Sequence, residues 1–126
     1  MFSAWHMDNS RTEDFNDWIT FKGQFEYGVS GFDKSSGTYT VQEDGIYIFG
    51  LQAKSGSQLA WTRIDFYRNN VPSYAVVSDD NTKDNFNNLG TTWTWTLKKG
   101  DKLRLKVGRG TVDAYLSWWG VRITAI

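Results

Sequence analysis

Residues 45–51, Gly-Ile-Tyr-Ile-Phe-Gly-Leu, place apolar side chains on both sides of an extended chain. Successive side chains of a β-strand point to opposite faces of its sheet, so this strand must be covered on both faces. In a two-layer β-sandwich, the core covers only one face of each sheet. The other face therefore needs a further cover, and we expect a second copy of the chain to supply it.

Alternation with a period of two predicts further strands. Residues 92–97 place Trp93 and Trp95 on one face and threonines on the other. Residues 102–107 alternate basic with apolar side chains. Between these two strands, the polar segment 98–101 contains a glycine and is predicted to be a hairpin connection.

The last strand is expected over residues 118–125. Its odd-numbered residues, Trp119 and Val121 among them, are expected to face the core, with Trp118 and Arg122 on the opposite side. The remaining strands are predicted at residues 2–7, 17–26, 37–41, 58–69 and 72–78. Two polar stretches, 8–17 and 79–88, are predicted to be loops.

Composition narrows the classes of protein that the chain can belong to. Eight Phe, seven Trp and six Tyr in 126 residues indicate one domain, 1–126, with a core built largely from rings. The absence of Cys excludes disulfides, thiolate catalysis and zinc fingers. The 14 basic and 14 acidic residues cancel, so we expect neither nucleic-acid binding nor attraction to an anionic membrane. The sequence contains no run of 18 apolar residues, so we expect no membrane insertion.

Several spaced landmarks resemble one known family. Four aromatic residues follow one another at intervals of six, five and seven positions: Phe21, Tyr27, Phe32 and Tyr39. The segment 45–49 begins six positions after Tyr39. Residues 97–103 carry a Leu-Lys-Lys-Gly-Asp-Lys-Leu turn, residues 118–120 read Trp-Trp-Gly, and residues 2–4 read Phe-Ser-Ala. Together these landmarks resemble the C1q globular domain, a tumour-necrosis-factor-like jelly roll, over essentially the whole chain. Tyr27, Tyr39 and the Gln42-Glu43 pair depart from the family's usual residues.

The resemblance implies an all-β, TNF/C1q-like jelly-roll sandwich of about ten short strands that forms a secreted homotrimer. On the family's geometry, Tyr47, Phe49 and Leu51 point into the sandwich. The residues expected to face neighbouring subunits are Ile46, Ile48, Gly50, Trp118 and Arg122. A charge near the three-fold axis is costly unless it is paired, so an acidic partner or a bound anion is expected for Arg122. The alternative is a surface position for this arginine.

The sequence offers little for catalysis. Its one histidine, His6, lies in the first predicted strand, and Gly28-Val29-Ser30-Gly31 is not the nucleophile elbow Gly-x-Ser-x-Gly. No phosphate-binding loop is present. We therefore expect a protein that is not an enzyme and that requires no cofactor.

One polar segment has the oxygen ligands that calcium prefers. The candidate ligands are Asp79, Asp80, Asn81 and Asp84, and some members of the resembled family bind calcium. The segment lacks the EF-hand pattern, so a solvated loop is the alternative reading.

Tryptophans are the candidate ligand-binding residues, because sugar rings stack on aromatic planes and neighbouring polar groups bind the hydroxyls. The candidates are Trp5, Trp18, Trp61 and Trp119, with Arg63 and Tyr67 beside Trp61 in sequence. A core or interface position is the alternative for each tryptophan.

Free-standing C1q-like proteins are often lectin-like pattern-recognition proteins of innate immunity. The resemblance therefore implies a module that binds carbohydrate or another cell-surface ligand on microbes. The alternative is a structural, adhesive or receptor-binding trimer that binds no sugar. Three equivalent sites would strengthen binding to a repetitive surface in the first case.

Overall fold

A computed structural model describes the chain except for residues 8–17, 27–30, 56–60, 80–87, 111 and 126. Within the described residues the structure consists of strands and connections, without a helix. The strands are β1 (Phe2–Met7), β2 (Gly23–Glu26), β3 (Phe32–Asp33), β4 (Thr38–Thr40), β5 (Gly45–Ser55), β6 (Trp61–Arg68), β7 (Val71–Asp79), β8 (Asn88–Leu97), β9 (Lys102–Arg109) and β10 (Val112–Thr124). The part of the chain that the structure describes has no helix that could cross a membrane.

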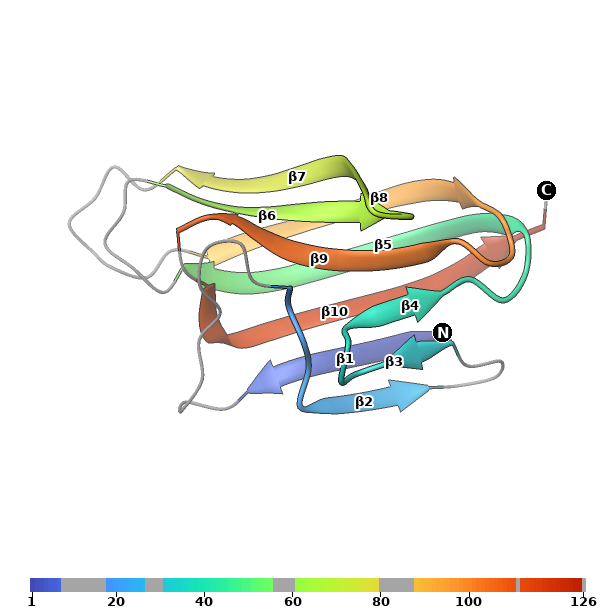
Figure 1. Cartoon of the computed structure of the whole chain (residues 1–126), viewed down its shortest axis with the longest axis horizontal. Helices are drawn as coiled ribbons and strands as arrows, with labels where there is room; N and C mark the ends of the chain where they lie inside the picture. Colours follow the sequence, from blue (N-terminus) through green and yellow to red (C-terminus); the bar gives the residue numbers. More distant parts are fainter. Residues whose placement is uncertain (8–17, 27–30, 56–60, 80–87, 111, 126) are drawn as a thin grey trace.

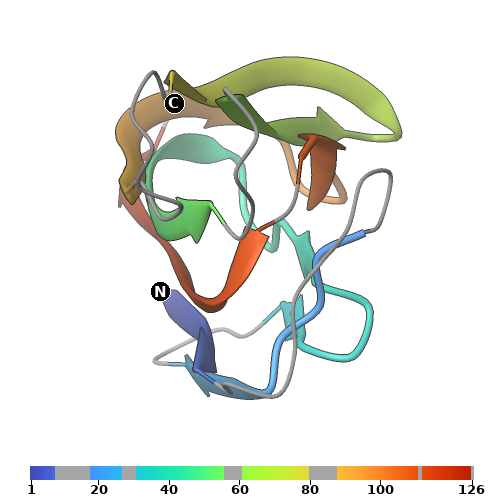
Figure 2. The ribbon, with the colours of Figure 1, turned by 90° about the vertical axis from the view of Figure 1, so that its left-hand side faces the viewer.

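The strands form two antiparallel five-stranded sheets packed face to face (Figures 1 and 2). One sheet has the order β2-β1-β10-β5-β8 and is called the β5 sheet below. The other has the order β3-β4-β9-β6-β7 and is called the β9 sheet. Both termini and the β8–β9 connection lie at the same end of the sandwich, on the right in Figure 1. The predicted all-β jelly roll is confirmed.

The core between the two sheets is built from aromatic rings, as the composition predicts. The Phe2 ring stacks on Phe32, with 4.9 Å between centroids, and meets Trp118 edge-on at 5.0 Å. Phe49 lies 6.3 Å from both Phe2 and Trp118. These rings come from β1, β3, β5 and β10, so they join the two sheets.

Strand β5 has apolar side chains on both faces, as predicted. Tyr47, Phe49 and Leu51 are at most 2% exposed and belong to the core. Ile46 and Ile48 lie on the opposite face and are only half-buried. The chain alone therefore covers one face of this strand and leaves the other partly open.

The even-numbered residues of β10 face the core, whereas the odd-numbered ones were predicted to do so. Trp118 pairs with Leu51 and Gly120 with Phe49, and cross-strand partners share a face. Trp118 is 1% exposed, so its expected place among the outward-facing residues is wrong. Trp119, expected in the core, lies on the outer face opposite Gly50. The prediction is wrong because both faces of β10 carry apolar residues and the core position at Gly120 has no side chain.

Residues 98–101 do not connect a hairpin, because β8 and β9 belong to different sheets. The segment crosses between the sheets, with Gly100 at a φ of 93°. Asp101 holds it: its carboxylate accepts hydrogen bonds from Lys98 N (2.9 Å), Arg68 Nη2 (2.9 Å) and Asn69 Nδ2 (3.0 Å). Burial alone would raise the pKa of Asp101, but these hydrogen bonds and the Arg68 charge outweigh it and lower the pKa.

The predicted strand over residues 17–26 forms only at its end, as β2. Before β2, Trp18 makes an isolated bridge with Lys106, and Ile19 N donates to Leu105 O at 2.8 Å. These contacts lie in the β9 sheet, whereas β2 pairs with β1 in the β5 sheet. The segment therefore crosses from one sheet to the other, which interrupts regular pairing.

Candidate functional site: a polar cleft on the β9 sheet

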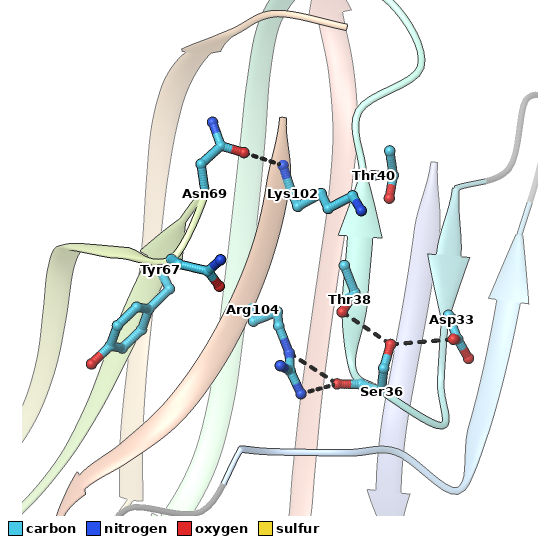
Figure 3. Close-up of a pocket in the computed structure, with 9 residues that line it drawn as sticks. Asp33, Ser36, Thr38, Thr40, Tyr67, Asn69, Lys102 and Arg104 are labelled. Atoms are coloured by element: carbon cyan, nitrogen blue, oxygen red, sulfur yellow. Dashed lines mark hydrogen bonds between the residues drawn. The ribbon is translucent and has the colours of Figure 1, made fainter. Parts of the chain in front are cut away.

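A cleft of about 530 Å³ opens on the face of the β9 sheet that is turned away from the core. Strands β4, β6 and β9 and two turns contribute its walls (Figure 3). The lining residues are Asp33, Ser36, Thr38, Thr40, Tyr67, Asn69, Asn70, Lys102 and Arg104. Nearly all of these side chains are polar or charged, so the cleft is suited to a polar ligand.

The alternation of β9 creates the floor of this cleft. Leu103, Leu105 and Val107 are at most 1% exposed and face the core. Lys102 and Arg104 therefore project outward, and Arg104 pairs with Tyr67 of β6. One strand thus supplies core packing on one side and cations on the other.

Arg104 is held by several groups at once. Its Nε and Nη2 donate to the Ser36 carbonyl oxygen at 3.1 and 2.7 Å (Figure 3). Its guanidinium lies 4.1 Å from the centroid of the Trp18 ring, a cation–π contact. Burial lowers the pKa of Arg104, but an arginine remains a cation at neutral pH. The cleft therefore contains a fixed positive charge.

The β3–β4 turn forms one wall. The carboxylate of Asp33 accepts hydrogen bonds from Ser35 N (3.0 Å) and from the Ser36 hydroxyl (3.2 Å). Gly37 has a φ of 72°, and a Cβ there would collide with the Ile19 carbonyl oxygen, so the turn needs glycine. The turn fixes the Ser36 carbonyl that Arg104 binds.

The β6–β7 turn forms the opposite wall. Asn69 and Asn70 have φ angles of 52° and 66°, the left-handed pair of a two-residue hairpin turn. The Asn69 side chain accepts a hydrogen bond from Lys102 N (2.9 Å) and donates to Asp101 (3.0 Å). Asn70 and Lys102 are exposed, and the Lys102 side chain points toward Thr40 (Figure 3).

Two of the predicted ligand-binding residues meet at this cleft. Tyr67 lines it, and the Trp18 ring lies edge-on to Tyr67 at 4.9 Å. Trp18 also contacts Lys106, whose Nζ lies 4.6 Å from the ring centroid. The structure thus places Trp18 as a support for two cations beside the cleft.

The other predicted ligand-binding residues are elsewhere. Arg63 pairs with Asp65 (2.8 Å) and donates to Gly108 O (3.2 Å). Trp119 lies on the β5 sheet, where its ring covers Gly50 and lines a hollow of about 380 Å³. Trp5 lies in β1 and Trp61 in β6, and their side chains are outside the described residues. Of the candidate tryptophans whose side chains the structure describes, Trp18 lies beside the β9 sheet and Trp119 on the β5 sheet, so these two do not share a site.

The predicted calcium ligands cannot be placed. Asp80, Asn81 and Asp84 lie outside the described residues, and so does the side chain of Asp79 at the end of β7. Within the described ranges, no group of three or more His, Asp or Glu residues could hold a metal ion.

Arg122 does not lie on the outer face of the β5 sheet. It pairs with Tyr47, so it shares the core-facing side at the end of the sandwich. There its Nη1 lies 3.0 Å from the Glu43 carboxylate, and its Nε donates to Asp44 O at 3.0 Å. The expected acidic partner exists, but it comes from the same chain.

Sequence reasoning missed most of the cleft. Lys102 and Arg104 occupy outward positions of a predicted strand, but the neutral net charge of the whole chain gives no sign of this local row of cations. The turn residues Ser36 and Asn69 carried no comparable signal, because their role depends on contacts with distant residues. Their partners Arg104 and Asp101 lie 68 and 32 positions further along the chain.

Comparison with known proteins identifies the class. The family model of the C1q domain matches residues 1–117, so the chain belongs to the C1q-domain family. Domains with this fold are generally non-enzymatic recognition or ligand-binding modules, and they are typically extracellular. No curated protein matches the sequence significantly.

Solved structures share the fold at low sequence identity. The globular domain of zebrafish complement 1qA matches with a TM-score of 0.80 and 19% identity, covering 99% of this chain and 98% of that one. Eiger TNF from S. frugiperda matches with 0.74 and 11%, covering 100% and 94%. Murine APRIL matches with 0.73 and 13%, covering 98% and 100%. At these identities the likeness establishes the C1q/TNF jelly-roll fold.

Proposed function

We propose that the chain is a secreted, C1q-like homotrimeric recognition module that binds carbohydrate or microbial-surface ligands in innate immunity. The observation that carries the proposal is the separation of two surfaces. The polar cleft lies on the β9 sheet, and the partly open apolar face lies on the β5 sheet. Assembly through the β5 sheet therefore leaves each cleft open to a ligand.

The β5 sheet supports assembly. Its outer face carries Ile46, Ile48, Trp119 and Val121, all half-buried in the single chain. Apolar surface of this kind favours burial against another chain. Domains of the C1q and TNF type are trimeric, which favours three copies.

A three-fold ring needs a second patch, because each subunit presents two different surfaces to its neighbours. The edge strand β7 supplies exposed apolar residues, with Val71 60% and Tyr74 44% exposed. The Tyr74 ring stacks on Trp93 of β8, with centroids 5.6 Å apart. We therefore assign this edge as the surface that meets the β5 sheet of the next subunit.

The cleft supports a sugar ligand. Threonine hydroxyls, an asparagine amide and cations surround it, and Tyr67 adds an aromatic ring at its border. Such groups bind sugar hydroxyls and the apolar face of a sugar ring. Three equivalent clefts would strengthen binding to a repetitive surface.

A glycan array competed with free sugar tests the proposal. The informative variant is Thr40→Val, which removes a cleft hydroxyl at constant shape and leaves the Ser36–Thr38 hydrogen bond of the β3–β4 turn intact. Losing one hydrogen bond should weaken glycan binding by about three- to tenfold. Ser35→Ala, which removes a hydroxyl from an exposed position outside the cleft lining and outside the β5 sheet, is the control and should bind like the wild type.

Two results would contradict the sugar-binding proposal. One is equal binding by both variants, which would remove the cleft from consideration. The other is a stable trimer that binds a protein but none of the glycans on the array. That result would favour the alternative, a structural, adhesive or receptor-binding trimer.

A further inference from the structure

We propose that the cleft selects acidic glycans, bound through their carboxylate or sulfate groups along one row of cations on β9. This inference rests on the sugar-binding function proposed above and specifies its ligand. The basic row consists of Lys102, Arg104 and Lys106, three successive outward positions of one strand. At about 3.3 Å per residue, neighbouring members are spaced by roughly 7 Å. An extended polyanion can follow such a row.

Arg104 is the fixed anion-binding group of the basic row. Its two hydrogen bonds to Ser36 O use two of its five N–H donors. The guanidinium also lies over the ring of Trp18, 4.1 Å from its centroid. A guanidinium fixed in this way can bind a carboxylate or sulfate with the remaining donors at little further cost in side-chain entropy.

Aromatic rings also hold Lys106. Its Nζ lies 4.6 Å from the Trp18 ring centroid and 5.5 Å from that of Tyr67. The cross-strand neighbour of Lys106 is Asp65, but this carboxylate is 2.8 Å from Arg63 Nε. The Arg63–Asp65 ion pair reduces the competition of Asp65 for Lys106.

The cleft is locally positive although the chain is neutral overall. Its lining contains Lys102 and Arg104 against one carboxylate, Asp33. Asp33 accepts hydrogen bonds from Ser35 and Ser36 within its own turn. Local charge decides which ligand a cleft attracts over distances within the Debye length, about 8 Å at physiological salt.

The neighbouring groups favour a glycan over a nucleic acid. Thr38, Thr40 and Asn70 line the same cleft and can bind sugar hydroxyls. Single-stranded nucleic acid needs open aromatic rings on which its bases stack. The Trp18 ring instead contacts two cations of the basic row, Arg104 and Lys106. Tyr67 then remains as a single ring in the cleft lining, which suits one sugar ring but not the stacking of successive bases.

Isothermal titration tests the inference with four defined probes. These are polygalacturonate for carboxylates, dextran sulfate for sulfates, neutral dextran, and an oligothymidylate of similar charge. We expect at least one acidic glycan to bind at least tenfold more tightly than neutral dextran and oligothymidylate. The comparison between the two acidic glycans identifies the preferred anionic group.

The double variant Lys102→Gln, Lys106→Gln should reduce acidic-glycan affinity by about tenfold or more and flatten its dependence on salt. The matched control is Lys98→Gln, Lys99→Gln, which removes the same charge from exposed lysines of the β8–β9 connection. The control should keep wild-type affinity. Circular dichroism and molar-mass measurements are the controls for folding and assembly of both variants. The salt dependence of binding by the wild type tests the role of charge without any substitution.

Each remaining outcome overturns the inference. Equal binding of neutral dextran would leave a sugar-binding module without acid selectivity. Equal losses in the two lysine variants, or equally tight oligothymidylate binding, would indicate unspecific charge attraction. Binding of no glycan at all would overturn the proposed function together with the inference.

Discussion

Gly120 decides which face of β10 packs into the core. A Cβ at this position would lie 2.6 Å from Phe2 Cε1 and 2.6 Å from Phe49 Cδ1, so the two rings occupy the space that a side chain would need. A glycine at a core position removes the apolar signal from the sequence pattern. The outward neighbours Trp119 and Val121 then look like the core side.

The substitution Gly120→Ala tests this placement. The added methyl group forces the Phe2 and Phe49 rings apart, which should lower the free energy of unfolding by about 1–3 kcal/mol. Urea unfolding followed by tryptophan fluorescence measures the change. Ser117→Ala, on the outer face of the same strand, is the control and should stay within about 0.5 kcal/mol of the wild type. Equal stability of Gly120→Ala and wild type would mean that residue 120 does not face the core.

Asp101 links stability to pH. Its carboxylate joins the β8–β9 connection to the β6–β7 turn through Arg68 and Asn69. Its pKa is lowered in the folded chain. The stability it contributes is therefore present above the unfolded pKa of about 3.9 and is lost as the pH falls through the folded pKa.

The variant Asp101→Asn should be less stable than the wild type by about 1–3 kcal/mol at pH 7, because charge-assisted hydrogen bonds are lost. The difference should hold above about pH 5 and shrink below about pH 4. Urea unfolding between pH 3 and 7 measures it. A difference that stays constant down to pH 3 would show that the charge of this carboxylate contributes nothing.

At the scale of elements, the sequence predicts strands in which apolar and polar side chains alternate regularly. It does not predict which strands the connections join into one sheet. The strand over 102–107 was predicted with the correct core residues, because only one of its faces is apolar. β10 was assigned the wrong face because both of its faces are apolar. Residues 98–101 have the composition of a hairpin turn, but strand pairing depends on distant residues, and β9 pairs with β6 instead of β8.

The β6–β7 hairpin depends on the left-handed backbone of its turn. Asn70 has a φ of 66°, a conformation that costs most residues about 1–2 kcal/mol. Asn70→Ala should therefore lower the free energy of unfolding by about 1 kcal/mol, whereas Asn70→Gly should be neutral or stabilising. Thermal unfolding of the two variants measures their order. The reverse order, with alanine more stable than glycine, would contradict a left-handed turn.

At the scale of the whole molecule, the candidate site depends on the fold. Its residues come from the β3–β4 turn, the β6–β7 turn and strands β4, β6 and β9, which no local pattern brings together. The sequence predicted the jelly roll and a doubly apolar β5, but among the cleft residues it singled out Tyr67 alone. The rest needed the topology that places β4, β9 and β6 side by side.

The outer face of the β5 sheet should govern assembly. Ile48→Glu places a charge in the middle of this face, where burial against another subunit would leave it unpaired. We expect this variant to be a monomer with the circular dichroism spectrum of the wild type. Ser35→Glu, in the exposed β3–β4 turn, adds the same charge and should remain trimeric. A trimeric Ile48→Glu would place the interface elsewhere.

Sedimentation velocity of the unmodified chain at micromolar concentration tests the central claim most directly. If the half-buried face of β5 packs against neighbouring copies, the main species should have about three times the mass of the 14.5 kDa chain. The boundary should keep this mass on moderate dilution. A single 14.5 kDa species over the same range would contradict assembly and, with it, recognition through three equivalent clefts.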